Sequence, residues 1–130
     1  MSTQYAPFAV EAGAVVVDNT SAFRMDPEVP LVVPEVNADD LLMHQGVIAN
    51  PNCSTIVMVV AVWPLYQRCR VKRIVVSTYQ AISGAGARAM EELESQTREV
   101  LAGHAAVPKE IPHQVAFNLF SHNSDIGPDG

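Results

Sequence analysis

Residues 48–56 read IANPNCSTI, and this stretch decides the predicted fold because one kind of element ends in it and another begins. A strand that delivers the chain must end before Pro51, which has no N–H to donate to a ladder. Asn52 is a favoured N-cap residue, which places Cys53 at the first position of a helix. The unpaired N–H groups and the dipole at a helix start favour an anion, and therefore the nucleophilic thiolate. Since buried cysteines are often inert, the position alone makes Cys53 a candidate nucleophile and no more.

A length of 130 residues allows one domain of ordinary size, and a packed core is expected because 48% of the residues are hydrophobic and 17% are charged. A net charge of −6 argues against nucleic acid or an anionic membrane as a partner. The longest apolar run, at residues 56–63, is too short to span a membrane, and the first residues lack the pattern of a signal peptide. The two cysteines form neither a disulfide framework nor a zinc-site spacing, so we expect a reducing cytoplasm and no metal.

The segments before Cys53 predict alternating helices and strands. Residues 5–12 are typical of a helix end, with Gly13 as its cap. Three apolar segments are predicted as strands, at residues 14–17, 31–33 and 47–50. The first is β-branched and apolar throughout, so we expect a parallel strand buried on both faces. A short helix from residue 37 or 38 to residue 43 completes an α/β pattern that begins partway through a βαβ unit.

The segments after Cys53 predict two more helices and two more strands. The apolar run at residues 56–63 is typical of a fully buried helix or a buried strand, since its β-branched residues favour a strand and the Asn52 cap favours a helix. We predict the helix, reaching about Gln67 and kinked or shortened by Pro64. A strand, an amphipathic helix capped by Gly103 and a last short strand are predicted at residues 71–79, 85–101 and 114–120. The acidic face of the amphipathic helix is predicted to be solvated, with an ion pair between Glu94 and Arg98.

Two other segments carry candidate binding residues. Arg24 follows the strand predicted at residues 14–17, where open α/β sheets bind ligands, and its guanidinium suits a phosphate or a carboxylate. Residues 83–86 read SGAG, and the glycines of this turn would let the backbone approach a ligand closely. Each segment also fits a plainer role, because SGAG occurs in ordinary turns and a loop arginine often pairs with acids such as Asp26 or Glu28.

Three segments together resemble the aspartate-semialdehyde dehydrogenase family. They read VDNTSAFRM at residues 17–25, NPNCST at residues 50–55 and STYQAISGAG at residues 77–86. Weaker matches lie at residues 31–37 and 116–118. The order and spacing of the three segments suit the family, and their joint agreement is far more specific than any one of them.

The resemblance implies an activity, the NADPH-dependent reductive dephosphorylation of β-aspartyl phosphate to aspartate semialdehyde in the biosynthesis of lysine, methionine and threonine. Cys53 would be the nucleophile that forms an acyl-thioester, and Asn52 would help hold the oxyanion. Arg24 would bind the phosphate, and Gln80 would contact the substrate near the thioester. The role of Gln80 comes from the resemblance alone.

The resemblance also implies a cofactor and a domain organisation. Ser83 and Gly84 would lie against the nicotinamide part of NADP. Residues 1–50 would be the end of a Rossmann-type, parallel-sheet NADP-binding domain. Residues 51–130 would begin an α+β catalytic and dimerisation domain, with the join near Pro51. The full-length form would be a homodimer.

The chain also departs from the family. Members are longer, begin with a glycine-rich loop, and carry an acid/base histidine and a carboxylate-binding arginine beyond the matching segments. We therefore interpret the chain as an internal fragment and expect it to be inactive by itself. Two alternatives stay open, a non-catalytic truncated module that pairs with full-length subunits, and another acyl-phosphate reductase such as the N-acetylglutamyl-phosphate reductases.

Overall fold

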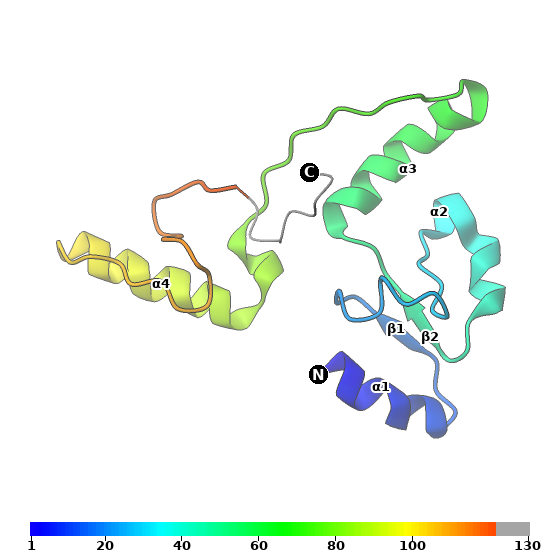
Figure 1. Cartoon of the computed structure of the whole chain (residues 1–130), viewed down its shortest axis with the longest axis horizontal. Coiled ribbons are helices and arrows are strands. Elements are labelled where there is room, and N and C mark those ends of the chain that lie inside the picture. The colour runs from blue at the N-terminus through cyan, green and yellow to red at the C-terminus, as the bar shows by residue number, and fades with distance from the viewer. Residues whose placement is uncertain (122–130) are drawn as a thin grey trace. The chain divides into compact units, whose positions relative to one another are not determined.

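The computed structural model of the chain describes residues 1–121, and Figure 1 shows their course. The chain divides into two compact units, Met1–Val76 and Ser77–Gly130. The first unit contains a small parallel sheet with helices, and the second is built on one long helix. This mixture of helices with parallel strands confirms the α/β class predicted from the sequence.

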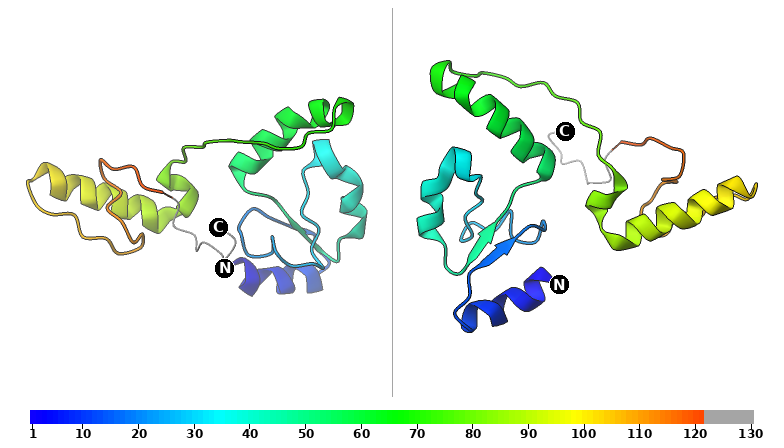
Figure 2. Two further views of the ribbon diagram at one scale, coloured as in Figure 1. Left: turned by 45° about the horizontal axis from the view of Figure 1, so that its top comes forward. Right: turned by 180° about the vertical axis from the view of Figure 1, so that it is seen from behind.

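The helices and strands of the first unit are α1 (Ser2–Glu11), β1 (Val16–Asp18), α2 (Pro34–Asn37), η1 (Ala38–Met43), β2 (Val47–Ala49) and α3 (Cys53–Arg68). The two strands run parallel, with Val16 opposite Val47 and Asp18 opposite Ala49, which confirms the strand predicted at residues 47–50. α1 packs against β1, and Figure 2 shows this helix and the strands from behind as well. Because parallel strands end at the same edge of a sheet, the loops that follow β1 and β2 begin side by side.

The predicted start of the chain, a helix followed by glycine and a strand, is confirmed. α1 ends at Glu11, and Gly13 has a φ of 83° while its N–H donates to the Val10 carbonyl at 2.9 Å. Glycine enters this left-handed region without strain, so it lets the chain turn into β1. The prediction that residues 14–17 are buried on both faces is wrong, because Val17 is 69% exposed. Side chains alternate along a strand, and no described element covers the face that carries Val17.

The prediction of a strand at residues 31–33 is wrong, since only an isolated parallel bridge joins Leu31 to Ala49. Pro34 opens α2 directly afterwards, which ends the extended segment before a ladder can form. The short helix predicted to begin at residue 37 or 38 is present as the 3₁₀-helix η1. This part of the chain therefore contributes one bridge to the sheet rather than a third strand.

α3 begins at Cys53, as predicted. Asn52 is its N-cap, and the side-chain oxygen of Asn52 accepts a hydrogen bond from the Ser54 N–H at 3.0 Å. The helix continues past Pro64. The prediction of a fully buried helix is wrong, because no residue of α3 is buried in the described part of the chain and Val57 is 72% exposed. An apolar pattern on every side shows that a helix needs cover, but the described residues do not supply that cover.

The second unit contains η2 (Ile82–Ala85) and α4 (Ala87–Leu101). Gly86 joins them with a φ of 97°, which glycine adopts without strain. α4 confirms the helix predicted at residues 85–101, and Gly103 turns the chain after it. The predicted ion pair between Glu94 and Arg98 is present on the exposed face of this helix.

Two strands predicted in the later part of the chain are wrong. Residues 71–79 and residues 114–120 both follow an irregular course. Val75 is 80% exposed, and Phe117 has a φ of 54°, which lies outside the range of strand residues. Both segments have the apolar residues of a strand, but no strand of the described chain lies beside either of them to complete a ladder.

The core of the second unit lies between α4 and the loop at residues 109–116. Ala89 of the helix packs with Ile111 and Val115 of the loop. The buried Gln96 side chain ties the same loop to the helix, because its Oε1 accepts the Val115 N–H at 2.8 Å and the Ala116 N–H at 3.3 Å. Apolar contact and hydrogen bonds to the backbone therefore hold an irregular segment in place.

Glu92 has the same role one turn earlier, so the prediction that the acidic face of α4 is solvated is wrong for this residue, while Glu91, Glu94 and Glu99 are exposed as predicted. Its carboxylate is buried and accepts the backbone N–H groups of Lys109 at 2.6 Å, Glu110 at 2.8 Å and Ile111 at 3.1 Å. Burial by itself raises the pKa of Glu92, but these bonds and one from Gln96 outweigh it and hold the pKa below its ordinary value. We call Glu92 and Gln96 the α4 clasp.

Candidate functional site

Cys53 is the first residue of α3, and its side chain is exposed. β2 and the buried Pro51 deliver the chain to this point, and the Asn52 cap fixes where the helix begins. The cap uses the side-chain oxygen of Asn52, and the Nδ2 group of Asn52 keeps two N–H donors that no acceptor in the described residues uses. A thiol and an amide donor therefore stand together at the positive end of a helix dipole.

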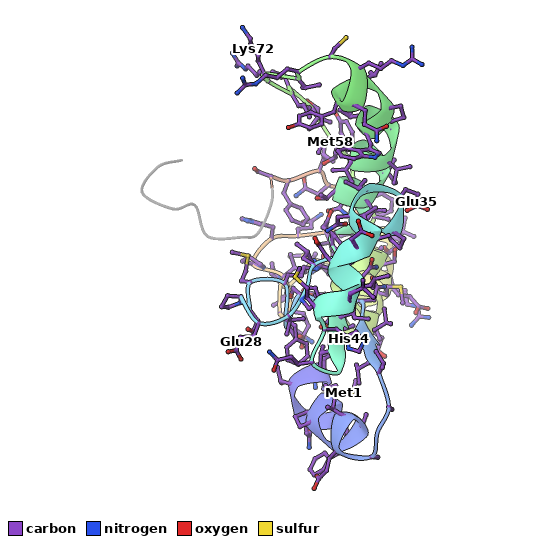
Figure 3. All side chains as sticks on the ribbon, turned by 90° about the vertical axis from the view of Figure 1, so that its right-hand side faces the viewer. Met1, Glu28, Glu35, His44, Met58 and Lys72 are labelled. Carbon is purple, nitrogen blue, oxygen red and sulfur yellow. The ribbon has the colours of Figure 1, made fainter. Side chains whose placement is uncertain are left out.

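Arg24 lies against the strand end that leads to Cys53. Its Nε donates to the Asn50 carbonyl at 2.9 Å, and its Nη2 donates to the Asn19 carbonyl at 3.3 Å. No ion pair joins it to Asp26 or Glu28 in the part of the chain that the structure describes, and Figure 3 shows Glu28 at the outer edge of its loop. The plainer role weighed for Arg24, a surface arginine in an ion pair, is therefore not what the structure shows.

Asn19 and Asn50 complete this arrangement, and sequence reasoning did not single them out. Asn50 Nδ2 donates to Asn19 Oδ1 at 2.7 Å. We call Asn19, Arg24 and Asn50 the strand-edge cluster. A signal for it was present in the sequence, because Asn19 lies two residues after the strand predicted at residues 14–17, Asn50 is the last residue of the strand predicted at residues 47–50, and parallel strands end at the same edge.

Asp18 supports the cluster from the end of β1. Its carboxylate is buried and accepts a hydrogen bond from Thr20 Oγ1 at 2.8 Å. Burial alone raises the pKa of Asp18, but hydrogen bonds from Ser2 and Thr20 and the charge of Arg24 outweigh it and lower the pKa below its ordinary value. Asp18 therefore carries a negative charge that attracts the Arg24 guanidinium.

The other predicted site residues belong to the second unit. Gln80 is exposed in the irregular segment before η2, and Ser83 and Gly84 are exposed within η2. A Cβ atom added at Gly84 would meet nothing within 4 Å, so a ligand could reach this part of the backbone. Arg24, Asn52 and Cys53 thus belong to the first unit, and Gln80, Ser83 and Gly84 belong to the second.

Comparison with known families extends this picture along the whole chain. The family model of the semialdehyde dehydrogenase NAD-binding domain matches residues 1–44, and that of the semialdehyde dehydrogenase dimerisation domain matches residues 62–130. The chain belongs to the semialdehyde dehydrogenase family. The resemblance stated from the sequence is confirmed, and so is a fold that combines parts of these two domains. The predicted join near Pro51 stays a prediction.

Individual relatives of the chain are aspartate-semialdehyde dehydrogenases. The chain is 58% identical over 125 residues to an aspartate-semialdehyde dehydrogenase of Synechocystis, a match that covers 96% of this chain and 37% of the relative. It is 53% identical over 133 residues to the enzyme of that name in Aquifex aeolicus, with 99% of this chain and 39% of the relative covered. This semialdehyde dehydrogenase chain thus spans about two fifths of the length of the curated relatives it matches.

Solved structures agree with the sequence relatives. The structure of aspartate semialdehyde dehydrogenase II from Vibrio cholerae, complexed with ASA, matches with a TM-score of 0.86 at 45% identity. The match covers 99% of this chain and 39% of the Vibrio cholerae chain. In the described part of this family member, no helix combines the length and the apolar character needed to cross a membrane.

Proposed function

We propose that this chain supplies the nucleophile and the phosphate-binding residue of an aspartate-semialdehyde dehydrogenase active site. One observation supports the proposal above others. The Arg24 guanidinium is bonded to the Asn50 carbonyl at 2.9 Å, and Asn50 lies three residues before Cys53 at the start of α3. A cation that can bind phosphate is therefore anchored to the backbone three residues before the exposed thiol that begins α3.

The chemistry follows from these residue types. The Cys53 thiolate attacks the acyl carbon of β-aspartyl phosphate, the oxygen of that carbonyl gains negative charge, and Asn52 Nδ2 is placed to donate to it. The C–O bond to phosphate then breaks, and the phosphate leaves with the electron pair. A thioester on Cys53 remains, so sulfur replaces phosphate and no oxidation has occurred at this step.

Arg24 has the donors that the leaving phosphate needs. An arginine side chain has five N–H donors, and two of these are used by the Asn50 and Asn19 carbonyls. Three N–H donors remain without an acceptor in residues 1–121. Bonds from a guanidinium to phosphate oxygens are charge-assisted and stronger than neutral ones, which suits the departure of a phosphate dianion.

Ser83 and Gly84 are the residues we propose for the nicotinamide part of NADP. The open backbone at Gly84 fits a flat ring, because no side chain stands on it and its surroundings are clear. The bound nicotinamide would supply the hydride that turns a thioester into an aldehyde. The choice of NADP over NAD, and the contact of Gln80 with the substrate, rest on the resemblance.

The same proposal extends to the assembly. The match to a dimerisation domain supports a homodimer of the whole enzyme. Residues 1–50 would belong to its NADP-binding domain and residues 51–130 to its catalytic domain, with β-aspartyl phosphate, aspartate semialdehyde and phosphate as its small-molecule partners in the cytoplasm. Since the relatives are longer, we expect the 130-residue chain alone to show no turnover.

A hybrid enzyme tests the function. In it, this chain replaces the matching segment of the Vibrio cholerae enzyme, and phosphate-dependent reduction of NADP by aspartate semialdehyde is measured. The hybrid should turn over, and Cys53→Ser should lower kcat by at least about 10³-fold, because a hydroxyl without a base is a poor nucleophile. Turnover that survives Cys53→Ser, or a folded dimeric hybrid with no activity, would contradict the proposal.

A further inference from the structure

We infer that Asn19 and Asn50 are positioning residues, whose mutual hydrogen bond holds the Arg24 guanidinium beside Cys53. The inference rests on the proposed function, because it gives Arg24 the role of binding an anion near that thiol. Asn50 Nδ2 donates to Asn19 Oδ1 at 2.7 Å, and this bond joins two loops that are 31 residues apart in the sequence.

The bonds of the strand-edge cluster form a closed ring. Asn50 gives its carbonyl to Arg24 Nε at 2.9 Å and its side-chain N–H to Asn19. Asn19 gives its side-chain oxygen to Asn50 and its own carbonyl to Arg24 Nη2 at 3.3 Å. Each asparagine therefore binds Arg24 with its main chain and the other asparagine with its side chain, and loss of either side chain opens the ring.

The ring is anchored to the sheet on one side and leads to Cys53 on the other. The Asn50 N–H donates to the Asp18 carbonyl at 2.8 Å, which extends the β1–β2 ladder by one bond. The Asp18 carboxylate attracts the Arg24 guanidinium from the same strand end. Because Asn50 is followed by Pro51 and the helix cap, the backbone that holds Arg24 is continuous with the backbone that presents Cys53.

Fixing Arg24 matters because a free arginine side chain samples many rotamers. Two bonds to carbonyls at different points of the plane set the direction of the guanidinium, so its three remaining N–H donors keep a constant position. The bond needs a side-chain donor at position 50 and a side-chain acceptor at position 19, and the two asparagines supply them. Replacement by alanine keeps both carbonyls and removes only the side-chain bond between them.

Alkylation of Cys53 by two reagents tests the inference in the 130-residue chain. Cys69→Ser first removes the other cysteine. The rate with anionic iodoacetate is then divided by the rate with neutral iodoacetamide. The fraction of thiolate and the exposure of Cys53 affect both rates alike and cancel, so the ratio reports the positive charge near the sulfur.

We expect Arg24→Gln to lower this ratio a few-fold, since a unit charge within roughly 5 Å of the reagent's carboxylate would change the rate about fourfold in water. Asn19→Ala and Asn50→Ala should each lower it about twofold or more, and the double variant no further than the larger single effect, because both break one ring. Asn118→Ala, an exposed asparagine bonded only to the Gln114 carbonyl in the described chain, is the matched control and should change nothing.

The outcomes separate the inference from the proposed function. If Arg24→Gln lowers the ratio and the Asn19 and Asn50 variants leave it unchanged, the positioning role is wrong and the role of Arg24 stands. If Arg24→Gln leaves the ratio unchanged, both are wrong. Variants that lower both rates equally show a structural role alone and also overturn the inference, and circular dichroism of each variant verifies its helix content.

Discussion

The strand-edge cluster of the first unit and the α4 clasp of the second have similar structural roles but differ in how many of their hydrogen-bonding groups the protein uses. Both use polar side chains to hold backbone that no regular element holds. Both carboxylate oxygens of Glu92 accept hydrogen bonds from the protein. Oε1 accepts from Lys109 and Gln96, and Oε2 accepts from Glu110 and Ile111.

Arg24 differs because some of its N–H donors are not used by the protein. Two of its five N–H donors bind carbonyls, and three have no acceptor within the described residues. Arg24 is also half-buried, whereas Glu92 is only 7% exposed. The comparison teaches that a polar side chain whose bonding groups are all used by the protein is structural, and one that is firmly held with donors left over is suited to a ligand.

The largest expected effect concerns the donors that Arg24 keeps. In the hybrid enzyme, Arg24→Gln should lower kcat/KM for phosphate about 10²-fold, because a neutral amide cannot replace charge-assisted bonds to the phosphate oxygens. Arg98→Gln is the matched control, since Arg98 pairs with Glu94 on an exposed helix face and should change kcat/KM less than about twofold. An equal loss of kcat/KM in the two variants would contradict the view that the N–H donors of Arg24 that the protein does not use bind the phosphate.

The next effect concerns Glu92, whose oxygens are all used. Glu92→Gln turns one acceptor into a donor that faces backbone N–H groups, so the loop at residues 109–111 should open more often. Hydrogen exchange at these three amides should become at least about tenfold faster. Glu91→Gln alters an exposed neighbour on the same helix and should leave the exchange unchanged. Unchanged exchange in Glu92→Gln would show that the clasp does not hold the loop.

A smaller effect should appear with acid. The pKa of Glu92 is lower in the folded unit than its ordinary value of 4.5, so its contribution to stability is complete above that value and is lost as pH falls through the lowered pKa. Exchange at the Lys109, Glu110 and Ile111 amides, corrected for the intrinsic pH dependence, should therefore rise below about pH 4.5. In Glu92→Gln this rise should be absent, and a rise of equal size there would assign it to another group.

The smallest effect concerns the support of the strand-edge cluster. Thr20 Oγ1 donates to Asp18 at 2.8 Å and accepts the Ala22 N–H at 3.1 Å. Thr20→Val keeps the shape of the side chain and removes both of these bonds and the contact of Thr20 Oγ1 with Ser2 Oγ at 3.2 Å, so the free energy of unfolding should fall by about 1 kcal/mol in urea titrations. Thr55→Val is the matched control at another exposed threonine of the first unit. An equal loss of unfolding free energy in this control would show that the hydrogen bonds of Thr20 contribute nothing specific to stability.

The start of α3 and the parallel strands could be predicted because local chemistry decides them. Asn52 caps the helix through the N–H two residues later, and Gly13 turns the chain with its own backbone, so each is recognised from its neighbours in the sequence. The predicted strands at residues 71–79 and 114–120 failed for the opposite reason. A strand needs a partner, and an apolar pattern does not say whether one is present.

Residues that bind distant backbone were the hardest to predict. Glu92 looked like part of a solvated acidic face because its partners are N–H groups 17 to 19 residues away, and backbone groups leave no mark in a sequence. The same holds for Arg24, whose acceptors are two carbonyls. Its place beyond a strand end predicted the region of the site, but the bonds by which Asn19 and Asn50 hold it became visible only in the structure.

One measurement tests the central claim most directly, that Cys53 forms a thioester on an acyl group whose phosphate Arg24 binds. The hybrid enzyme is mixed with aspartate semialdehyde and NADP without phosphate, and the protein is then digested and analysed by mass spectrometry. We predict one equivalent of NADPH and an aspartyl thioester on the peptide that contains Cys53, released when phosphate is added. A modification on Cys69, or a burst of NADPH that persists in Cys53→Ser, would contradict the account.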